Sequence, residues 1–143
     1  MRTTLNLGLD IKIPEVYIAD ESQRLRMYKR ISSLSTPEEC ADLQTELEDR
    51  YGAVPPSVSN LFSYALLKSA AERLLVDSVE RKAEEIWVRF HAEAPVSPDK
   101  LTAFVRRHRA AIFRPDGVLR FRLTAQDGGL FTQIQNVLQE LRA

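Results

Sequence analysis

Four carboxylates share one side of an expected helix. Glu39, Asp42, Glu46 and Asp49 are separated by three, four and three residues, and this spacing places side chains on one face of an α-helix. Such an acidic stripe can bind the arginine side chains of a partner as ion pairs. The alternative is a solvated face, since Glu46 can pair with Arg50 and acids near a helix start favour its dipole. The position of Asp49 favours a binding role. A negative charge in the last turn opposes the helix dipole and lowers helix stability, so its presence indicates a function.

A second charged group is basic. Between residues 106 and 122 the chain carries six arginines and a single acid, Asp116; the arginines are Arg106, Arg107, Arg109, Arg114, Arg120 and Arg122. Nucleic-acid binding by this basic hairpin is the second functional hypothesis, and it predicts an affinity that falls steeply with salt. Apolar residues of the hairpin alternate onto its expected buried face, which makes them poor platforms for stacking bases; they are Phe113, Leu119, Phe121 and Leu123. A solvated basic face or an acidic protein partner therefore fits better.

The residue patterns of common catalytic sites do not occur in the sequence. No lysine follows a glycine-rich loop, which excludes a P-loop. Two histidines, His91 and His108, are too few to build a zinc site. Cys40 lies on an apolar helix stripe, where a buried core cysteine is expected, and a reactive Cys40 remains the enzyme hypothesis. We expect no catalytic residue, no metal and no cofactor in this chain.

The acidic stripe needs a well-defined helix to position it. Thr36-Pro37-Glu38-Glu39 is a capping box with proline at the first helical position. The apolar side chains that follow share one face, and Gly52 suits the left-handed end of a helix; they are Cys40, Leu43, Leu47 and Tyr51. A helix over 21–34, capped by Asp20 with Leu25, Tyr28, Ile31 and Leu34 on its buried face, precedes this element. A long helix from Ser57 to about Leu75 follows it.

Strands are expected before and after these helices. Alternating apolar residues predict a strand over 4–13 and a second over 86–90, with 79–82 as its pairing partner. A fourth helix opens at Ser97, a hairpin joins 111–114 to 118–123, and a last amphipathic helix starts just after Gly128-Gly129. The order predicts an α+β fold, a small and mostly antiparallel sheet packed by about five helices.

Length and composition predict one intracellular domain. The 143 residues suit a single domain, 1–143, with an extended lead-in (1–19), a three-helix region (20–75) and a strand-helix-hairpin-helix region (76–143). Twenty basic and twenty acidic side chains cancel, and no stretch approaches the ~20 apolar residues that cross a bilayer. With one cysteine no internal disulfide can form, so we expect a cytoplasmic protein without a membrane partner.

Several motifs together resemble a known family. Tyr17-Ile18 is followed by Arg24-Leu25 and Tyr28-Lys29-Arg30-Ile31, and then by Glu46-Leu47-Glu48-Asp49-Arg50-Tyr51-Gly52 and Pro55. The last of these reproduces a pattern of Glu-Leu-x-Asp-Arg-aromatic-Gly followed by proline and a long helix. The sequence resembles the C-terminal domain of bacterial transcription-repair coupling factors. From about Tyr17 to Leu75 the residues themselves match the family's pattern. In the rest of the chain the order of the elements matches more than the residues do.

The resemblance implies a regulatory function for the chain. In that family the parent protein is an ATP-driven DNA translocase that displaces stalled RNA polymerase and recruits excision repair through UvrA. Its C-terminal domain contacts an N-terminal UvrB-like module of the same polypeptide and masks the UvrA-binding surface, without touching nucleic acid itself. The family's contact residues fall on Glu46 and Asp49, with Glu39, Asp42 and Arg50 beside them. The resemblance thus implies an autoinhibitory domain that has no enzyme activity of its own.

Overall fold

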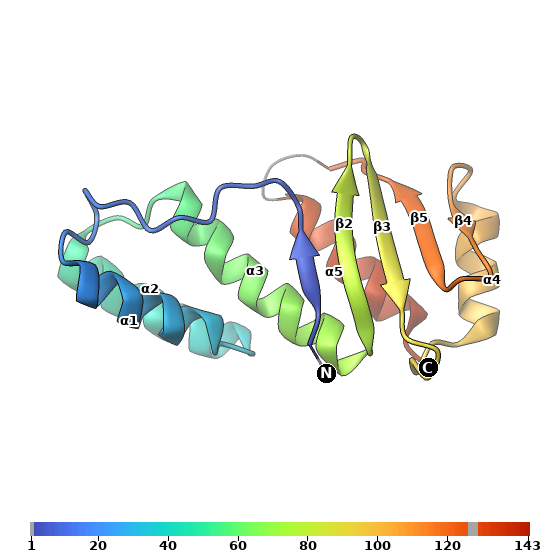
Figure 1. Cartoon of the computed structure of the whole chain (residues 1–143), viewed down its shortest axis with the longest axis horizontal. Helices are drawn as coiled ribbons and strands as arrows, with labels where there is room; N and C mark the ends of the chain where they lie inside the picture. Colours follow the sequence, from blue (N-terminus) through green and yellow to red (C-terminus); the bar gives the residue numbers. More distant parts are fainter. Residues whose placement is uncertain (1, 126–128) are drawn as a thin grey trace. The chain divides into compact units, whose positions relative to one another are not determined.

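Five helices and a five-stranded sheet make up the part of the chain that the computed structural model describes, residues 2–125 and 129–143 (Figure 1). Four neighbouring strand pairs form the sheet, and three of the four are antiparallel. The expected α+β class is therefore confirmed. Residue contacts divide the chain into two units: a helical unit, Leu9–Ser69, and a sheet unit, Met1–Gly8 with Ala70–Ala143.

The helical unit contains α1 (Glu21–Ser32), α2 (Pro37–Tyr51) and most of α3 (Pro56–Arg73). The Asp20 carboxylate accepts a hydrogen bond from the Gln23 N–H at 2.9 Å, and the capping box at Thr36 is present. Gly52 ends α2 at φ 89°. Side chains from all three helices and from the segment before α1 form one core: Ile13, Ile18, Met27, Ile31, Cys40, Leu43, Leu47, Val58, Leu61, Phe62 and Ala65.

The buried face of α1 differs from the expected one. Met27 and Ile31 are its buried residues, whereas Leu25 is 55% exposed. Met27 lies two residues from Leu25, which is more than half a helical turn away, so burying the first turns the second toward solvent. Lys29 and Arg30 lie on the last turn, where cations favour the helix dipole.

The sheet unit contains β1 (Thr4–Asn6), β2 (Val76–Lys82), β3 (Glu85–Phe90), α4 (Pro98–Arg107), β4 (Ile112–Phe113), β5 (Val118–Arg122) and α5 (Gly129–Leu141). The strand order is β1-β2-β3-β5-β4, with β1 parallel to β2. Figure 1 shows α5 crossing one face of this sheet. The buried residues Val79, Val88 and Leu119 lie on neighbouring strands of the sheet, and α5 buries Leu130, Ile134 and Leu138.

Two sequence expectations about the strands are wrong. The strand expected over 4–13 covers only Thr4–Asn6. Gly8 has a φ of 68°, a left-handed conformation that a strand cannot continue through. Phe113 was expected on the buried face of the hairpin but is 39% exposed, because it lies on a two-residue strand at the sheet edge. Gly128, expected beside the start of the last helix, lies outside the described residues.

Candidate functional site

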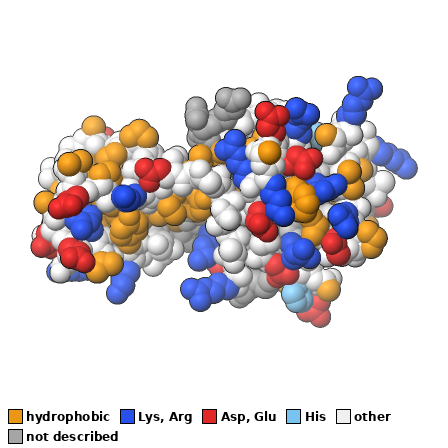
Figure 2. All heavy atoms as spheres, turned by 45° about the horizontal axis from the view of Figure 1, so that its top comes forward, with side chains coloured by type: hydrophobic (Ala, Val, Ile, Leu, Met, Phe, Trp, Pro, Cys, Tyr) orange, Lys and Arg blue, Asp and Glu red, His pale blue; other side chains and the backbone are white. Residues whose placement is uncertain are grey.

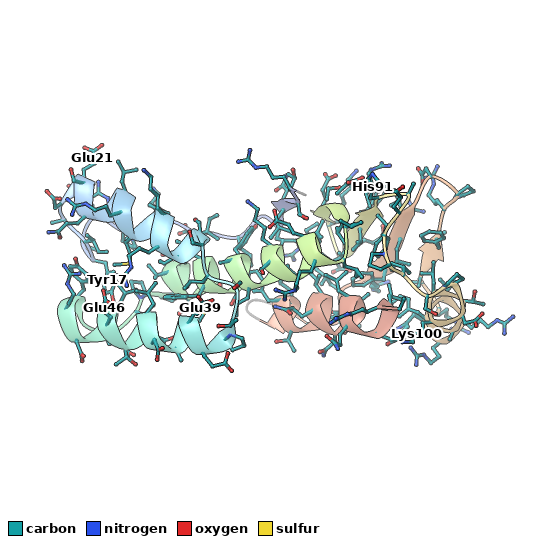
Figure 3. All side chains as sticks on the ribbon, turned by 90° about the horizontal axis from the view of Figure 1, so that it is seen from below. Tyr17, Glu21, Glu39, Glu46, His91 and Lys100 are labelled. Atoms are coloured by element: carbon teal, nitrogen blue, oxygen red, sulfur yellow. The ribbon has the colours of Figure 1, made fainter. Side chains whose placement is uncertain are left out.

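The acidic stripe lies on α2 next to α1. Figure 3 shows Glu39 and Glu46 on the side of α2 that faces α1. Glu39, Asp42 and Glu46 line a groove between the two helices, together with Lys29, Arg30, Ser33, Leu34 and Leu43. The groove is thus acidic along α2 and basic along α1. The helical spacing of the four carboxylates agrees with the sequence prediction.

Glu46 is held by a two-pronged contact with an arginine of α1. The two guanidinium nitrogens of Arg30 donate to the two carboxylate oxygens at 2.5 and 3.0 Å. Arg50, one helical turn further along α2, lies 3.8 Å from the same carboxylate. The hydrogen bonds that Arg30 donates to Glu46 lower the pKa of the Glu46 carboxyl and raise the pKa of the Arg30 guanidinium. Side chains of both remain partly exposed, 49% for Arg30 and 38% for Glu46.

Glu39 has a structural task at the start of α2. One of its carboxylate oxygens, Oε1, accepts hydrogen bonds from the backbone N–H groups of Ser35 and Thr36, each at 3.0 Å, and from both hydroxyls. These hydrogen bonds lower the pKa of Glu39, and the bond from the Ser35 N–H has the largest effect. Glu39 therefore completes the cap and has less capacity for a partner than the sequence spacing alone indicates.

Asp42 and Asp49 are the open members of the stripe. Both side chains are exposed, and within the described residues neither forms an ion pair. They lie on either side of Glu46 along the helix, four residues before it and three after it. The stripe therefore presents two unpaired carboxylates that flank one carboxylate already bound to an arginine.

Two tyrosines fix the carboxyl end of α2. The Tyr17 hydroxyl donates to the Gly52 carbonyl at 2.9 Å, and its ring lies 5.7 Å from that of Tyr51. The guanidinium of Arg50 lies 5.0 Å from the centre of the Tyr51 ring. Burial, followed by the nearby Glu48 charge, raises the pKa of Tyr17. The motif that resembled the family thus holds the last turn of α2, where Asp49 lies.

Arg30 was not predicted as a site residue. The basic segment Arg24 to Ile31 was a signal for it, since packing of that segment against an acidic helix would explain its charges. Sequence spacing gives the face of each helix, but it does not give the register between two helices. Only the folded arrangement selects Arg30 as the partner of Glu46.

Three of the six arginines of the second hypothesis pair with carboxylates. Arg107 pairs with Glu140, Arg122 lies 3.0 Å from Glu84, and Arg114 lies 3.9 Å from Asp116. The Arg120 guanidinium lies 4.6 Å from the centre of the Trp87 ring, which Lys82 also approaches, at 4.0 Å. Arg106 and Arg109 are exposed and have no ion pair among the described residues. Arg107, Arg109 and Arg122 line one groove of about 730 Å³, which also contains Glu140.

The residues considered for catalysis occupy structural positions. Cys40 is a core residue with 9% of its surface exposed, and burial raises the pKa of its thiol. The His108 ring lies 4.2 Å from that of Phe104, and Nδ1 of His91 accepts the Glu93 N–H at 3.0 Å. Among the described residues, no cluster of three or more histidines, cysteines and acids could hold a metal ion. No helix in the described part of the chain has the length and hydropathy to cross a bilayer.

Comparison with known proteins matches this chain to one domain family and to several transcription-repair-coupling factors. The model of the TRCF domain matches residues 7–101. The transcription-repair-coupling factor of Rickettsia prowazekii is 28% identical over 138 residues, or 96% of this chain and 12% of that protein. That of Myxococcus xanthus is 33% identical over 141 residues, 96% of this chain and 12% of that protein. The Bacillus subtilis protein is 36% identical over 97 residues, 68% of this chain and 8% of that protein.

The fold matches a solved structure as well. The crystal structure of the C-terminal domain of a transcription-repair coupling factor superposes with a TM-score of 0.82 at 22% identity, covering 99% of this chain and 94% of that one. The chain spans 8 to 12% of the length of the three curated relatives described above. The similarity to those proteins is therefore confined to one segment of each.

Proposed function

Because the chain belongs to the TRCF domain family, we propose that it is the C-terminal regulatory domain of a longer transcription-repair coupling factor. The parent would be an ATP-dependent DNA translocase of the bacterial cytoplasm that engages RNA polymerase, DNA and UvrA. The domain itself would bind and would carry out no chemistry. Its partner would be the N-terminal UvrB-like module of the same polypeptide, whose UvrA-binding surface it would mask.

One observation carries this proposal: the carboxylates of α2 are arranged to receive arginines. The Glu46 carboxylate already accepts two hydrogen bonds from the guanidinium of Arg30. Asp42 and Asp49 lie one turn to each side of Glu46 and are exposed. A guanidinium is recognised best by such paired carboxylate oxygens, because its planar donors match them two at a time. Asp49 and Glu46 would make the main contact, and Asp42, Arg50 and Glu39 would border it.

The exposure of these carboxylates suits a contact that must open. Exposed ion pairs contribute about 0 to 1 kcal/mol each, and salt screens them. A few such pairs can hold a closed state that competes with an open one, so that engagement of polymerase shifts the equilibrium toward the open form. A large apolar interface would release the UvrA-binding surface less readily.

The test is binding of this chain to the UvrB-like module of its parent, with Glu46→Lys plus Asp49→Lys as the disrupting variant. We expect the variant to lose at least about tenfold in affinity, because two attractive contacts become repulsive. A matched control is Glu15→Lys plus Glu93→Lys, which changes the net charge equally at exposed positions outside α2. Circular dichroism checks that all three proteins are folded.

The outcomes separate cleanly. Loss of binding only in the α2 variant supports the proposal. Equal loss in both variants assigns the effect to net charge, and undiminished binding by the α2 variant removes the acidic stripe from the contact. Absence of binding by the native chain overturns the proposal as a whole.

A further inference from the structure

Strand β4 exposes apolar side chains at an open edge of the sheet. Ile112 and Phe113 are 47% and 39% exposed, and they are the exposed large hydrophobic residues of the described part of the sheet unit. Their cross-strand partners are Arg120 and Leu119, respectively. Since Leu119 is buried and Arg120 lies beside Trp87, the two side chains lie on opposite faces of the sheet edge. One extended segment lying along this edge would cover both.

The backbone of β4 is positioned to pair with another strand. The Arg114 N–H donates to the Val118 carbonyl at 2.9 Å, and the Gly117 N–H donates to the Arg114 carbonyl at 3.0 Å, which closes the hairpin. In an antiparallel ladder, pairing toward the neighbouring strand alternates from residue to residue. Arg114 and Ile112 therefore bond to β5, while the N–H and carbonyl of Phe113 point toward the open edge. Figure 1 shows β4 as the last strand on that side of the sheet.

The charges beside this edge are basic. Arg109 precedes β4 by three residues and Arg114 follows it directly. Arg109 has no ion pair among the described residues, and Arg114 has a long one, at 3.9 Å from Asp116. Figure 2 shows Lys and Arg side chains projecting from the sheet unit at its right-hand side, where Figure 1 places α4 and β4. A partner segment that carries carboxylates would therefore bind this edge more tightly than one without them.

We propose that the β4 edge, defined as Arg109 and Ile112 to Arg114, docks an extended acidic segment of a partner protein as an added strand. Backbone hydrogen bonds to Phe113 would supply the pairing, Ile112 and Phe113 the apolar contacts, and Arg109 and Arg114 the charge selectivity. This site lies in the sheet unit and does not depend on the function proposed for α2.

A peptide fits the edge better than a single-stranded nucleic acid does. Stacking of successive bases requires several free aromatic rings. Among the exposed large hydrophobic residues of the described part of the chain, Phe113 is the one aromatic residue. The Trp87 ring lies on the other face of the sheet, that of Ile112, and Lys82 and Arg120 already approach it. An open strand edge, in contrast, is a feature that a polypeptide backbone recognises directly.

The test uses the whole chain, labelled with ¹⁵N, and three probes: a peptide of alternating glutamate and valine, the same peptide with lysine for glutamate, and a deoxythymidine oligonucleotide. We expect saturable binding of the acidic peptide in the range of about 10 µM to 1 mM, with the largest shifts at the Phe113 amide and slowed exchange of its hydrogen. Phe113→Pro, which removes that N–H at an edge where proline is tolerated, should abolish the binding.

A charge-matched pair tests the selectivity. Arg109→Glu should weaken acidic-peptide binding by at least about fivefold, and Arg26→Glu, at an exposed position of α1 in the other unit, should leave it within about twofold. The proposal is overturned if the acidic peptide does not bind at about 1 mM, if the lysine peptide binds equally well, or if the oligonucleotide alone shifts the Phe113 amide. It also fails if folded Phe113→Pro protein binds the peptide as the native chain does.

Discussion

The Glu46 carboxylate cannot receive an incoming arginine fully while Arg30 holds both of its oxygens. Arg30 would therefore compete with the partner for Glu46, and Arg50, at 3.8 Å, would compete less. Removing the competitor should strengthen the contact proposed for α2. We expect Arg30→Gln to raise affinity for the UvrB-like module about two- to fivefold, since an exposed ion pair contributes at most about 1 kcal/mol. Isothermal titration calorimetry at low and high salt would measure it.

The control for this residue is Arg26→Gln. It removes the same charge from the same helix, at an exposed position without an ion pair among the described residues. Equal gains in both variants would mean that the overall charge of α1, and not competition for Glu46, sets the affinity. A drop in affinity for Arg30→Gln would mean that the partner needs Arg30 to position the carboxylate.

At the scale of the element, α2 should be sensitive to acid. Two of its carboxylates have a lowered pKa in the folded chain, Glu39 through the hydrogen bonds at the cap and Glu46 through Arg30. A group with a lowered folded pKa stabilises the protein above its unfolded value, about 4.3 for glutamate, and this contribution is lost as pH falls through the folded value. The free energy of unfolding should thus decrease from about pH 5 downward.

Urea unfolding at a series of pH values tests this dependence. Glu39→Gln plus Glu46→Gln should be less stable than the native chain near neutral pH, and the difference should shrink as the pH falls through the lowered pKa values of the two native carboxyls. Glu15→Gln plus Glu93→Gln changes exposed acids outside α2 and should follow the native curve. A difference that stays constant across the pH range would assign the loss to packing instead of ionisation.

How far the sequence predicts an element depends on how local its determinants are. The start and end of α2 follow from Thr36, Pro37, Glu39 and Gly52, which act within a few residues, and the prediction is confirmed. The pattern of alternation reports neither the end of β1 at Asn6, before the left-handed Gly8, nor the exposure of Phe113 on an edge strand. The stripe on α2 follows from helical spacing, but the occupation of Glu46 by Arg30 depends on the register between two helices.

At the scale of the whole molecule, α3 joins the helical unit and the sheet unit as one unbroken helix, Pro56–Arg73. It supplies Leu61 and Phe62 to the helical core, and its last four residues belong to the sheet unit. If the helical unit unfolded alone, these four residues would be too few to persist as a helix. We therefore expect both units to unfold in one transition.

Two natural probes test this cooperativity, since the chain has one tryptophan and one cysteine. Trp87 fluorescence reports the sheet unit, and labelling of the Cys40 thiol reports the helical unit. Leu47 is fully buried in the helical core, so Leu47→Ala should cost about 2 to 5 kcal/mol and lower both midpoints together. Leu25→Ala, the same substitution at a 55% exposed site, should change neither appreciably. Early exposure of Cys40 in Leu47→Ala with an unmoved Trp87 midpoint would show that the units unfold independently, and that the acidic face of α2 can be lost while the β4 edge stays folded.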